Sequence, residues 1–166
     1  MTVNRGKQFE SVIREAFEKV PNVSIDRLHD QTNGYKGSQN ICDFIVYREP
    51  YEYYFECKSV HGASLPFSNV TETQWNGLLE KSKIDGVFAG VICWWIDKDV
   101  TRFLPIDLLN WCQTCQNMKS VRYDYEPFDP RTIIVPSFSF IEIKGKKKRV
   151  FFDYDMEEFL NAISMS

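Results

Sequence analysis

Apolar residues at helical spacing open the chain. Phe9, Ile13 and Phe17 recur every four residues and Pro21 follows them, so the pattern predicts an amphipathic helix over the first twenty residues. The same periodicity predicts three further helices: one with Trp75, Leu78 and Leu79 on one face, one from residue 107 to about 117, and a last one with Met156, Phe159, Leu160 and Ile163.

Apolar or alternating runs between these helices predict strands. Residues 23–28 alternate, and residues 41–60 (ICDFIVYREPYEYYFECKSV) form two apolar runs around a short turn. Residues 86–96 (GVFAGVICWWI) are apolar almost throughout but too few to span a bilayer, so they predict a central buried strand. Residues 101–106 predict another strand, and a strand pair is expected around the lysine-rich turn at 144–149.

Polar stretches with glycine or proline separate these elements. Residues 29–40, 61–69 and 118–136 show little periodicity and are predicted as loops. The order helix, strand, hairpin, helix, strand predicts an α/β domain with a mixed sheet. The chain has 166 residues, 43% of them hydrophobic, and no clear linker, which indicates a single domain, 1–166.

Three charged residues interrupt the apolar runs of 41–60. Asp43 is expected inside the first strand, and Glu56 and Lys58 inside the second. An ionised side chain is rarely buried unless it is paired or bound to a metal. Because side chains alternate along a strand, Glu56 and Lys58 share a face while Cys57 points the other way. Two carboxylates beside an ammonium fit a metal-dependent phosphodiesterase, and a salt-bridged hairpin without chemistry is the alternative.

The same spacing occurs a second time, so spacing alone does not select the site. Asp129, Glu142 and Lys144 repeat the intervals of the first set. Asp129 lies between Phe128 and Pro130 in a predicted loop, whereas the first set lies in a predicted hairpin. This context favours the first set.

Charge and cysteine content narrow the class of protein. The formal net charge of −3 argues mildly against a nucleic-acid binder, although basic residues can still gather on one face. Five cysteines, an odd number with no secretory signal before them, indicate reduced thiols in a cytosolic compartment. Cys112 and Cys115 form one C-x-x-C in a helical stretch without a second pair, so helix packing is favoured over a metal or redox role.

Several motifs in a fixed order carry a resemblance to a known family. They are RGKQFE at 5–10, NICDF at 40–44, FECKS at 55–59, LPFSN at 65–69, and Gln74 in the following helix. Over residues 4–109, about two thirds of the chain, the sequence resembles the RecU family of Holliday junction resolvases, within the PD-(D/E)xK nuclease superfamily, and looks most like its shorter phage-borne members. The resemblance implies a restriction-endonuclease-like mixed β-sheet flanked by helices, in a protein of the bacterial host cytoplasm.

The resemblance also implies roles for single residues. Asp43 and Glu56 would bind Mg²⁺, for which Mn²⁺ can substitute. Lys58 would position or activate the hydrolytic water, and Glu10 and Gln74 would support the site. Each role has a structural alternative: Glu10 as a solvated helix residue, Gln74 in a helix capping box, and Lys58 as an ion-pair partner alone.

Family members are homodimers that cut two strands of a four-way junction symmetrically, so branched DNA and a second copy of the chain are the expected partners. In members with a long stalk, that stalk enters the junction, but the corresponding residues 27–40 are few here. Arg27, His29 and Lys36 are the local candidates for contact with the DNA backbone. The cluster at 144–149 is a second candidate, with a solvated turn as its alternative; its DNA-binding lysines would be Lys146, Lys147 and Lys148.

Two apolar segments are candidates for the dimer interface. They are the run at 86–96 and the helix that carries Trp111, and core packing is the alternative for both.

The sequence thus predicts a structure-selective, Mg²⁺-dependent endonuclease, a crossover junction endonuclease that resolves four-way DNA junctions. Two other classes stay open. One is another PD-(D/E)xK endonuclease of the repair or restriction type, and the other is a non-catalytic module that binds branched DNA.

Overall fold

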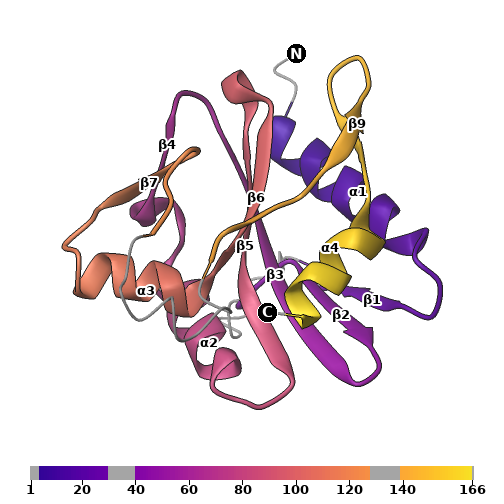
Figure 1. The fold of residues 1–166 in the computed structure, drawn as a ribbon, viewed down its shortest axis with the longest axis horizontal. Coiled ribbons are helices and arrows are strands. Elements are labelled where there is room, and N and C mark those ends of the chain that lie inside the picture. The colour runs from indigo at the N-terminus through magenta and orange to yellow at the C-terminus, as the bar shows by residue number, and fades with distance from the viewer. Residues whose placement is uncertain (1–3, 30–39, 128–138, 166) are drawn as a thin grey trace, which may run out of the picture.

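A six-stranded sheet forms the centre of the computed structural model, which describes residues 4–29, 40–127 and 139–165 (Figure 1). β3 and β5 run parallel, and the other neighbouring strands run antiparallel. The predicted fold class, an α/β protein with a mixed sheet flanked by helices, is confirmed. The strands lie in the order β1 (Ser24–Arg27), β2 (Phe44–Arg48), β3 (Tyr51–Val60), β5 (Val87–Trp95), β6 (Val100–Pro105) and β8 (Ile141–Glu142).

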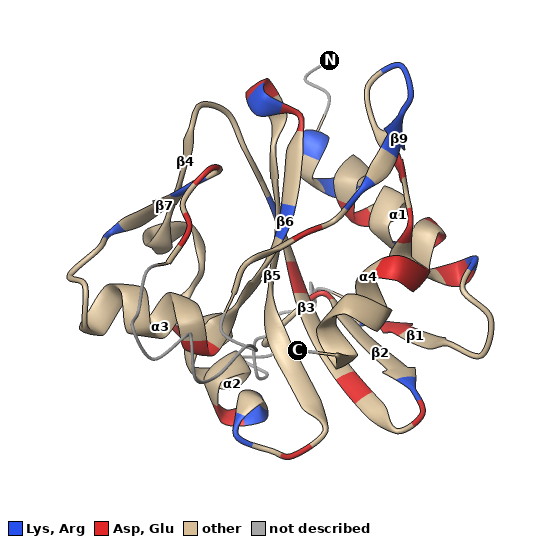
Figure 2. Ribbon diagram, viewed as in Figure 1, with Lys and Arg blue, Asp and Glu red and all other residues tan. Residues whose placement is uncertain are grey.

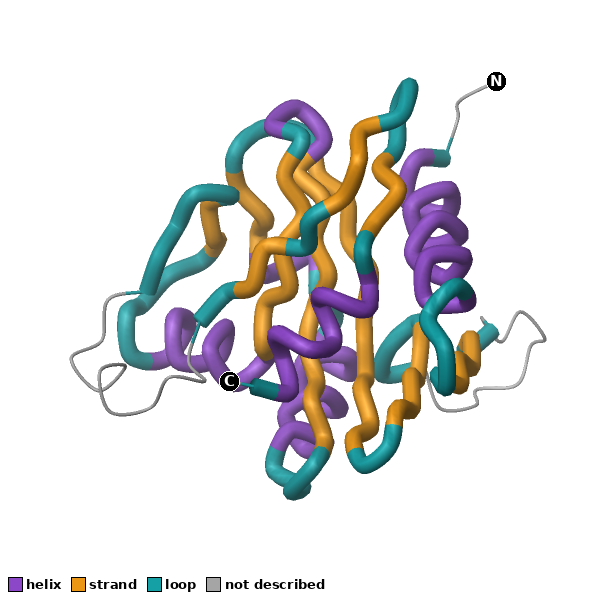
Figure 3. Tube along the Cα trace, turned by 45° about the vertical axis from the view of Figure 1, so that its right-hand side comes forward, coloured by secondary structure: helices purple, strands orange, loops and turns teal. Residues whose placement is uncertain are grey.

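Helices cover both faces of this sheet (Figures 1 and 3). α1 (Arg5–Glu18) and α4 (Met156–Ser164) pack on one face, and α2 (Glu72–Ser82) and α3 (Ile106–Thr114) pack on the other. All four predicted helices form because each buries one apolar face. The third ends earlier than predicted, since Asn117 has a φ of 53°, which a right-handed helix excludes.

β3 carries different chemistry on its two faces. Phe55 and Cys57 belong to the core beneath α1 and α4, whereas Glu56 faces α2 and Lys58 lies beside it. The predicted alternation of these residues is confirmed. The strand therefore separates an aromatic face from a charged one.

Asp43 does not lie inside a strand, contrary to the prediction. β2 begins at Phe44, and Asp43 precedes it. The backbone N–H of Asp43 donates to the Phe55 carbonyl at 3.1 Å, but the next N–H on β3, that of Cys57, donates to the Asp43 carboxylate at 2.8 Å. The acidic side chain thus takes the place of the next main-chain acceptor, and the pairing of β2 with β3 stops there.

Two stretches predicted as loops contain regular structure. β4 (Ser64–Pro66) pairs antiparallel with β7 (Ser120–Arg122), and the 3-10 helix η1 (Phe67–Asn69) follows β4. Leu65 and Val121 are buried where these strands meet. Pro66 is tolerated because it occupies a position of the ladder that makes no hydrogen bond: the bonds on this side fall at Ala63 and at Phe67, whose N–H donates to the Lys119 carbonyl.

The lysine-rich segment forms the predicted strand pair. β9 (Gly145–Lys147) pairs antiparallel with β10 (Phe152–Tyr154). A second 3-10 helix, η2 (Ile96–Lys98), connects β5 to β6. β5 itself lies between β3 and β6 and is buried over most of its length, so the run at 86–96 serves core packing. None of the described helices has the length and apolarity needed to cross a membrane.

Candidate active site

Glu56 and Lys58 meet on the face of β3 that α2 covers. The Nζ atom of Lys58 lies 2.9 Å from Oε1 of Glu56, and the two side chains are 20% and 5% exposed. Removing two charges from water costs free energy that their attraction often fails to return. A buried ion pair of this kind is therefore weak evidence for a stabilising role.

Gln74 connects α2 to Glu56. Its Nε2 donates to Oε1 of Glu56 at 2.9 Å, while its Oε1 accepts from the backbone N–H of Thr71 at 3.0 Å. The Thr71 hydroxyl accepts from the backbone N–H of Gln74 in return, which completes a capping box at the start of α2. Because the capping box directs the amide oxygen to Thr71, the NH₂ group faces Glu56. The capping role and the predicted contact with the site are therefore compatible.

Asp43 is held by the main chain of the neighbouring strand. Its Oδ2 accepts from the N–H of Cys57, and its carbonyl accepts from the N–H of Leu28 at 2.8 Å. This places the carboxylate beside the β3 residue that follows Glu56. The structure thus brings Asp43, Glu56 and Lys58 together, as the sequence predicted.

Burial raises the pKa of both carboxyl groups. The pKa of Asp43 rises from 3.8 to about 7, first because the group is buried and second because the charge of Glu56 is close. Burial also raises the pKa of Glu56, although the Lys58 ammonium opposes the rise. The charge of Glu56 therefore disfavours ionisation of Asp43, and a cation between the two carboxyl groups would favour the ionised form of both.

The donor atoms at this site fit a magnesium ion. Oε2 of Glu56 is buried and has no hydrogen-bond partner among the described residues. Coordination to a metal would satisfy this oxygen, which is otherwise costly to bury. Within the described ranges no group of three or more His, Cys, Asp or Glu side chains could hold an ion, so the described residues offer two carboxylates at most. Mg²⁺ suits such a site because it keeps several waters and adds substrate phosphate oxygens to one or two carboxylates.

Glu10 extends from α1 toward the same region. Its Oε2 lies 3.2 Å from Nη2 of Arg27, and its charge contributes to the raised pKa of Glu56. Glu10 is thus part of the electrostatic surroundings of the carboxylate pair. Arg27, a candidate for DNA contact, is engaged here in an ion pair on β1.

The remaining lysine candidates for DNA binding lie outside the described residues or on the β9 hairpin. Lys36 lies outside the described residues. Figure 2 shows basic residues along the β9 hairpin, where Lys147 pairs with Asp99 and Lys148 lies 3.9 Å from Asp153. These ion pairs lower the charge available for phosphate, and a DNA-binding role for this turn, Lys146 included, stays a prediction.

The second acidic set forms no comparable cluster. Glu142 is exposed on β8, opposite Arg102 of β6, and Lys144 pairs with Glu158 of α4 at 3.8 Å. Asp129 lies outside the described residues. Context within the hairpin was therefore the correct basis for choosing the first set as the buried one.

Within the C-x-x-C pair, Cys112 serves helix packing and Cys115 does not. Cys112 is buried on α3 and Cys115 is exposed just beyond it. Burial raises the pKa of the Cys112 thiol to about 11, so the reactive thiolate is scarce at neutral pH.

Arg102 is a buried charge that the sequence pattern does not reveal. It is 5% exposed and donates to the carbonyls of Tyr123 and Tyr125 and to the carboxylate of Glu126. Arg102 therefore connects β6 to the segment that follows β7. In the sequence, its position within an apolar run is the one feature that indicates burial.

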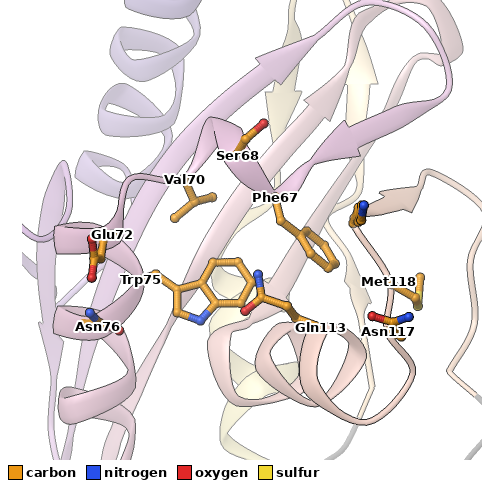
Figure 4. Close-up of a pocket in the computed structure, with 10 residues that line it drawn as sticks. Phe67, Ser68, Val70, Glu72, Trp75, Asn76, Gln113, Asn117 and Met118 are labelled. Atoms are coloured by element: carbon orange, nitrogen blue, oxygen red, sulfur yellow. The ribbon is translucent and has the colours of Figure 1, made fainter.

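A cavity of about 670 Å³ lies on another side of α2 (Figure 4). Phe67 and Trp75 provide apolar walls, with amide groups such as that of Gln113 near them. The cavity residues of α2, among them Glu72, fall on the side of the helix turned away from Gln74. This cavity is therefore separate from the carboxylate pair.

No protein-family model matches the sequence, and no curated protein matches it. Among solved structures, the chain is similar to Hjc, a Holliday junction resolvase from the archaeal hyperthermophile Archaeoglobus fulgidus. The two share 17% sequence identity, the match covers 63% of this chain and 75% of that chain, and the TM-score is 0.46. The assignment of a function rests on the residues of this chain.

Proposed function

We propose that the chain is a RecU-like, structure-selective, Mg²⁺-dependent endonuclease that resolves four-way DNA junctions as a homodimer. The observation that carries the proposal is Glu56, a buried carboxylate with one unpartnered oxygen, between Lys58 and Gln74 and close to Asp43. The motifs at 5–10, 40–44, 55–59 and 65–69 support the narrower assignment to junction resolvases.

Each residue of the site has a distinct task in this proposal. Asp43 and Glu56 hold Mg²⁺, or Mn²⁺ in its place; when bound, the metal supplies Lewis-acid chemistry at the scissile phosphate. Gln74 fixes the orientation of the Glu56 carboxylate. The Lys58 ammonium orients the attacking water and offsets negative charge that develops on the phosphate oxygens. Glu10 supports this arrangement through its charge and its pair with Arg27.

A homodimer suits a substrate with near two-fold symmetry. One chain carries one carboxylate pair, and the resolution of a junction needs two coordinated cuts. Branch shape rather than base sequence would select the substrate, through phosphate contacts from Arg27, Lys36 and the basic turn of β9. The reduced cysteines are consistent with action in the cytoplasm of a bacterial host cell.

The decisive experiment compares a synthetic four-way junction with a linear duplex of the same sequence. We expect paired symmetric cuts in the junction with Mg²⁺ or Mn²⁺, little cutting with Ca²⁺, and none in excess EDTA. Glu56→Gln should lose cleavage by several orders of magnitude but still bind, whereas Glu142→Gln, its matched control in the second acidic set, should cut normally.

Other outcomes assign the chain to another class. Equal cutting of junction and duplex would indicate a PD-(D/E)xK endonuclease of the repair or restriction type. Binding of the junction without cleavage in any metal would indicate a non-catalytic module. Light scattering that gives a monomer on the junction would remove the two-site mechanism.

A further inference from the structure

Gly77 lies in the middle of α2, where glycine weakens a helix. A methyl group at this position would place its carbon 2.2 Å from Cγ2 and 2.6 Å from Cβ of Ile41. Both separations are far below contact distance. Because Cβ is bonded directly to the backbone, no change of the Ile41 rotamer removes the overlap, and the main chain at residue 41 or α2 itself would have to move.

Ile41 belongs to the short segment that delivers Asp43 to the site. Residues 40–43 come before β2 and take no part in its regular pairing with β3. The backbone N–H of Asp43 and its side chain bond to β3, but Ile41 itself packs among the apolar residues beneath α2. A displacement of Ile41 therefore acts two residues away from a carboxylate that has to face Glu56.

One side of α2 contacts the Glu56 carboxylate and the segment that leads to Asp43. Gln74 and Gly77 are three residues apart, so they lie on one face of the helix. Gln74 donates to Glu56, and Gly77 accommodates Ile41. We propose that Gly77 is a positioning residue for the metal site: its missing side chain lets Ile41 seat against α2 and so sets the place of Asp43 relative to Glu56. This inference rests on the proposed metal-dependent nuclease.

The test is a double-mutant cycle read by metal affinity. Mn²⁺ binding to the full chain is followed by the electron paramagnetic resonance signal of free Mn²⁺, for wild type, Gly77→Ala, Ile41→Gly and the double variant. Thr73→Ala, an exposed position on the same helix, is the matched control for helix propensity. Circular dichroism and cooperative thermal unfolding establish that each variant is folded.

We expect Gly77→Ala to bind Mn²⁺ at least tenfold more weakly than wild type and Thr73→Ala to bind equally well. Ile41→Gly should also bind weakly because it leaves a gap against α2. The double variant removes the side chain at residue 41 and adds a methyl group at residue 77, so the overlap is relieved. It should bind Mn²⁺ at least threefold more tightly than either single variant.

Two results would overturn the inference. One is a Gly77→Ala variant that binds Mn²⁺ with wild-type affinity. The other is a double variant that binds Mn²⁺ no more tightly than Ile41→Gly. This second comparison also decides the question if Gly77→Ala alone does not fold. A failure of the proposed function appears differently. In that case wild type and Glu56→Gln would bind Mn²⁺ equally weakly. The inference about Gly77 would then fail together with the proposed function.

Discussion

Asp43→Asn is expected to make the metal-free protein more stable above neutral pH while abolishing the proposed metal site. The pKa of Asp43 is raised in the folded state, so the folded protein retains a proton that the unfolded chain has lost. The folded state therefore binds more protons between pH 4 and 7, and the free energy of unfolding falls as the pH rises through this range. Asparagine carries no such penalty, and its amide oxygen can still accept from the N–H of Cys57.

The size of the change in the free energy of unfolding follows from the shift in the pKa of Asp43. A rise from 3.8 to about 7 corresponds to about 4 kcal/mol over the whole titration, at about 1.4 kcal/mol per pKa unit. Between pH 5 and pH 8, wild type should lose about 3 kcal/mol more stability than Asp43→Asn. Burial, the first cause of the raised pKa of Glu56, is the same in both proteins, so the contribution of Glu56 has the same direction in each.

Urea denaturation in EDTA at a series of pH values measures this difference. Asp26→Asn, an exposed aspartate on β1, is the matched control and should follow wild type. Mg²⁺ added at pH 8 to ten times its dissociation constant should stabilise wild type by about 1.4 kcal/mol and leave Asp43→Asn unchanged. Parallel stability curves for wild type and Asp43→Asn in EDTA would refute the raised pKa of Asp43 in the folded state.

Three further changes test other parts of the structure. Gln74→Ala should weaken Mn²⁺ affinity by about 10- to 100-fold, as loss of a group that orients a metal ligand commonly does, and unchanged affinity in a metal titration would reduce Gln74 to a helix cap. Arg102→Met should lower the free energy of unfolding by about 3 kcal/mol in urea, since the carbonyls of Tyr123 and Tyr125 lose their donor, and a loss below about 1 kcal/mol would contradict this. Lys146→Ala in a cleavage-dead background should flatten the slope of log K against log salt for junction binding by about 0.9, and a parallel slope would leave the turn a solvated surface.

The sequence predicted the elements whose signal is periodic and long. The four helices and the central strand formed where apolar spacing placed them, and the charged hairpin was recognised because ionised residues are rare in apolar strands. β4 and β7 were missed because each has only three residues. Their pairing depends on burial of Leu65 and Val121, which no local pattern reveals.

The candidate site shows the same division between local and distant information. Alternation along one strand was enough to place Glu56 beside Lys58. The partnership of Glu10 with Arg27 joins a helix to an edge strand and was beyond local spacing. Asp43 was expected within a strand because its neighbours are apolar, but its carboxylate captures the N–H of Cys57 and ends the pairing.

The face of β3 opposite the carboxylates explains how the sheet tolerates them. There Phe55 stacks on Phe17 and Tyr53 with ring centroids 5.5 and 5.7 Å apart, and Tyr53 stacks on Phe88 at 5.4 Å. Such pairs add stabilisation beyond the area they bury, so β3 is fixed strongly from one side. A folded protein has only a small net stability, and a buried carboxylate oxygen without a partner uses part of it. The aromatic layer offsets that cost, which allows the opposite face to carry charges that serve chemistry rather than packing.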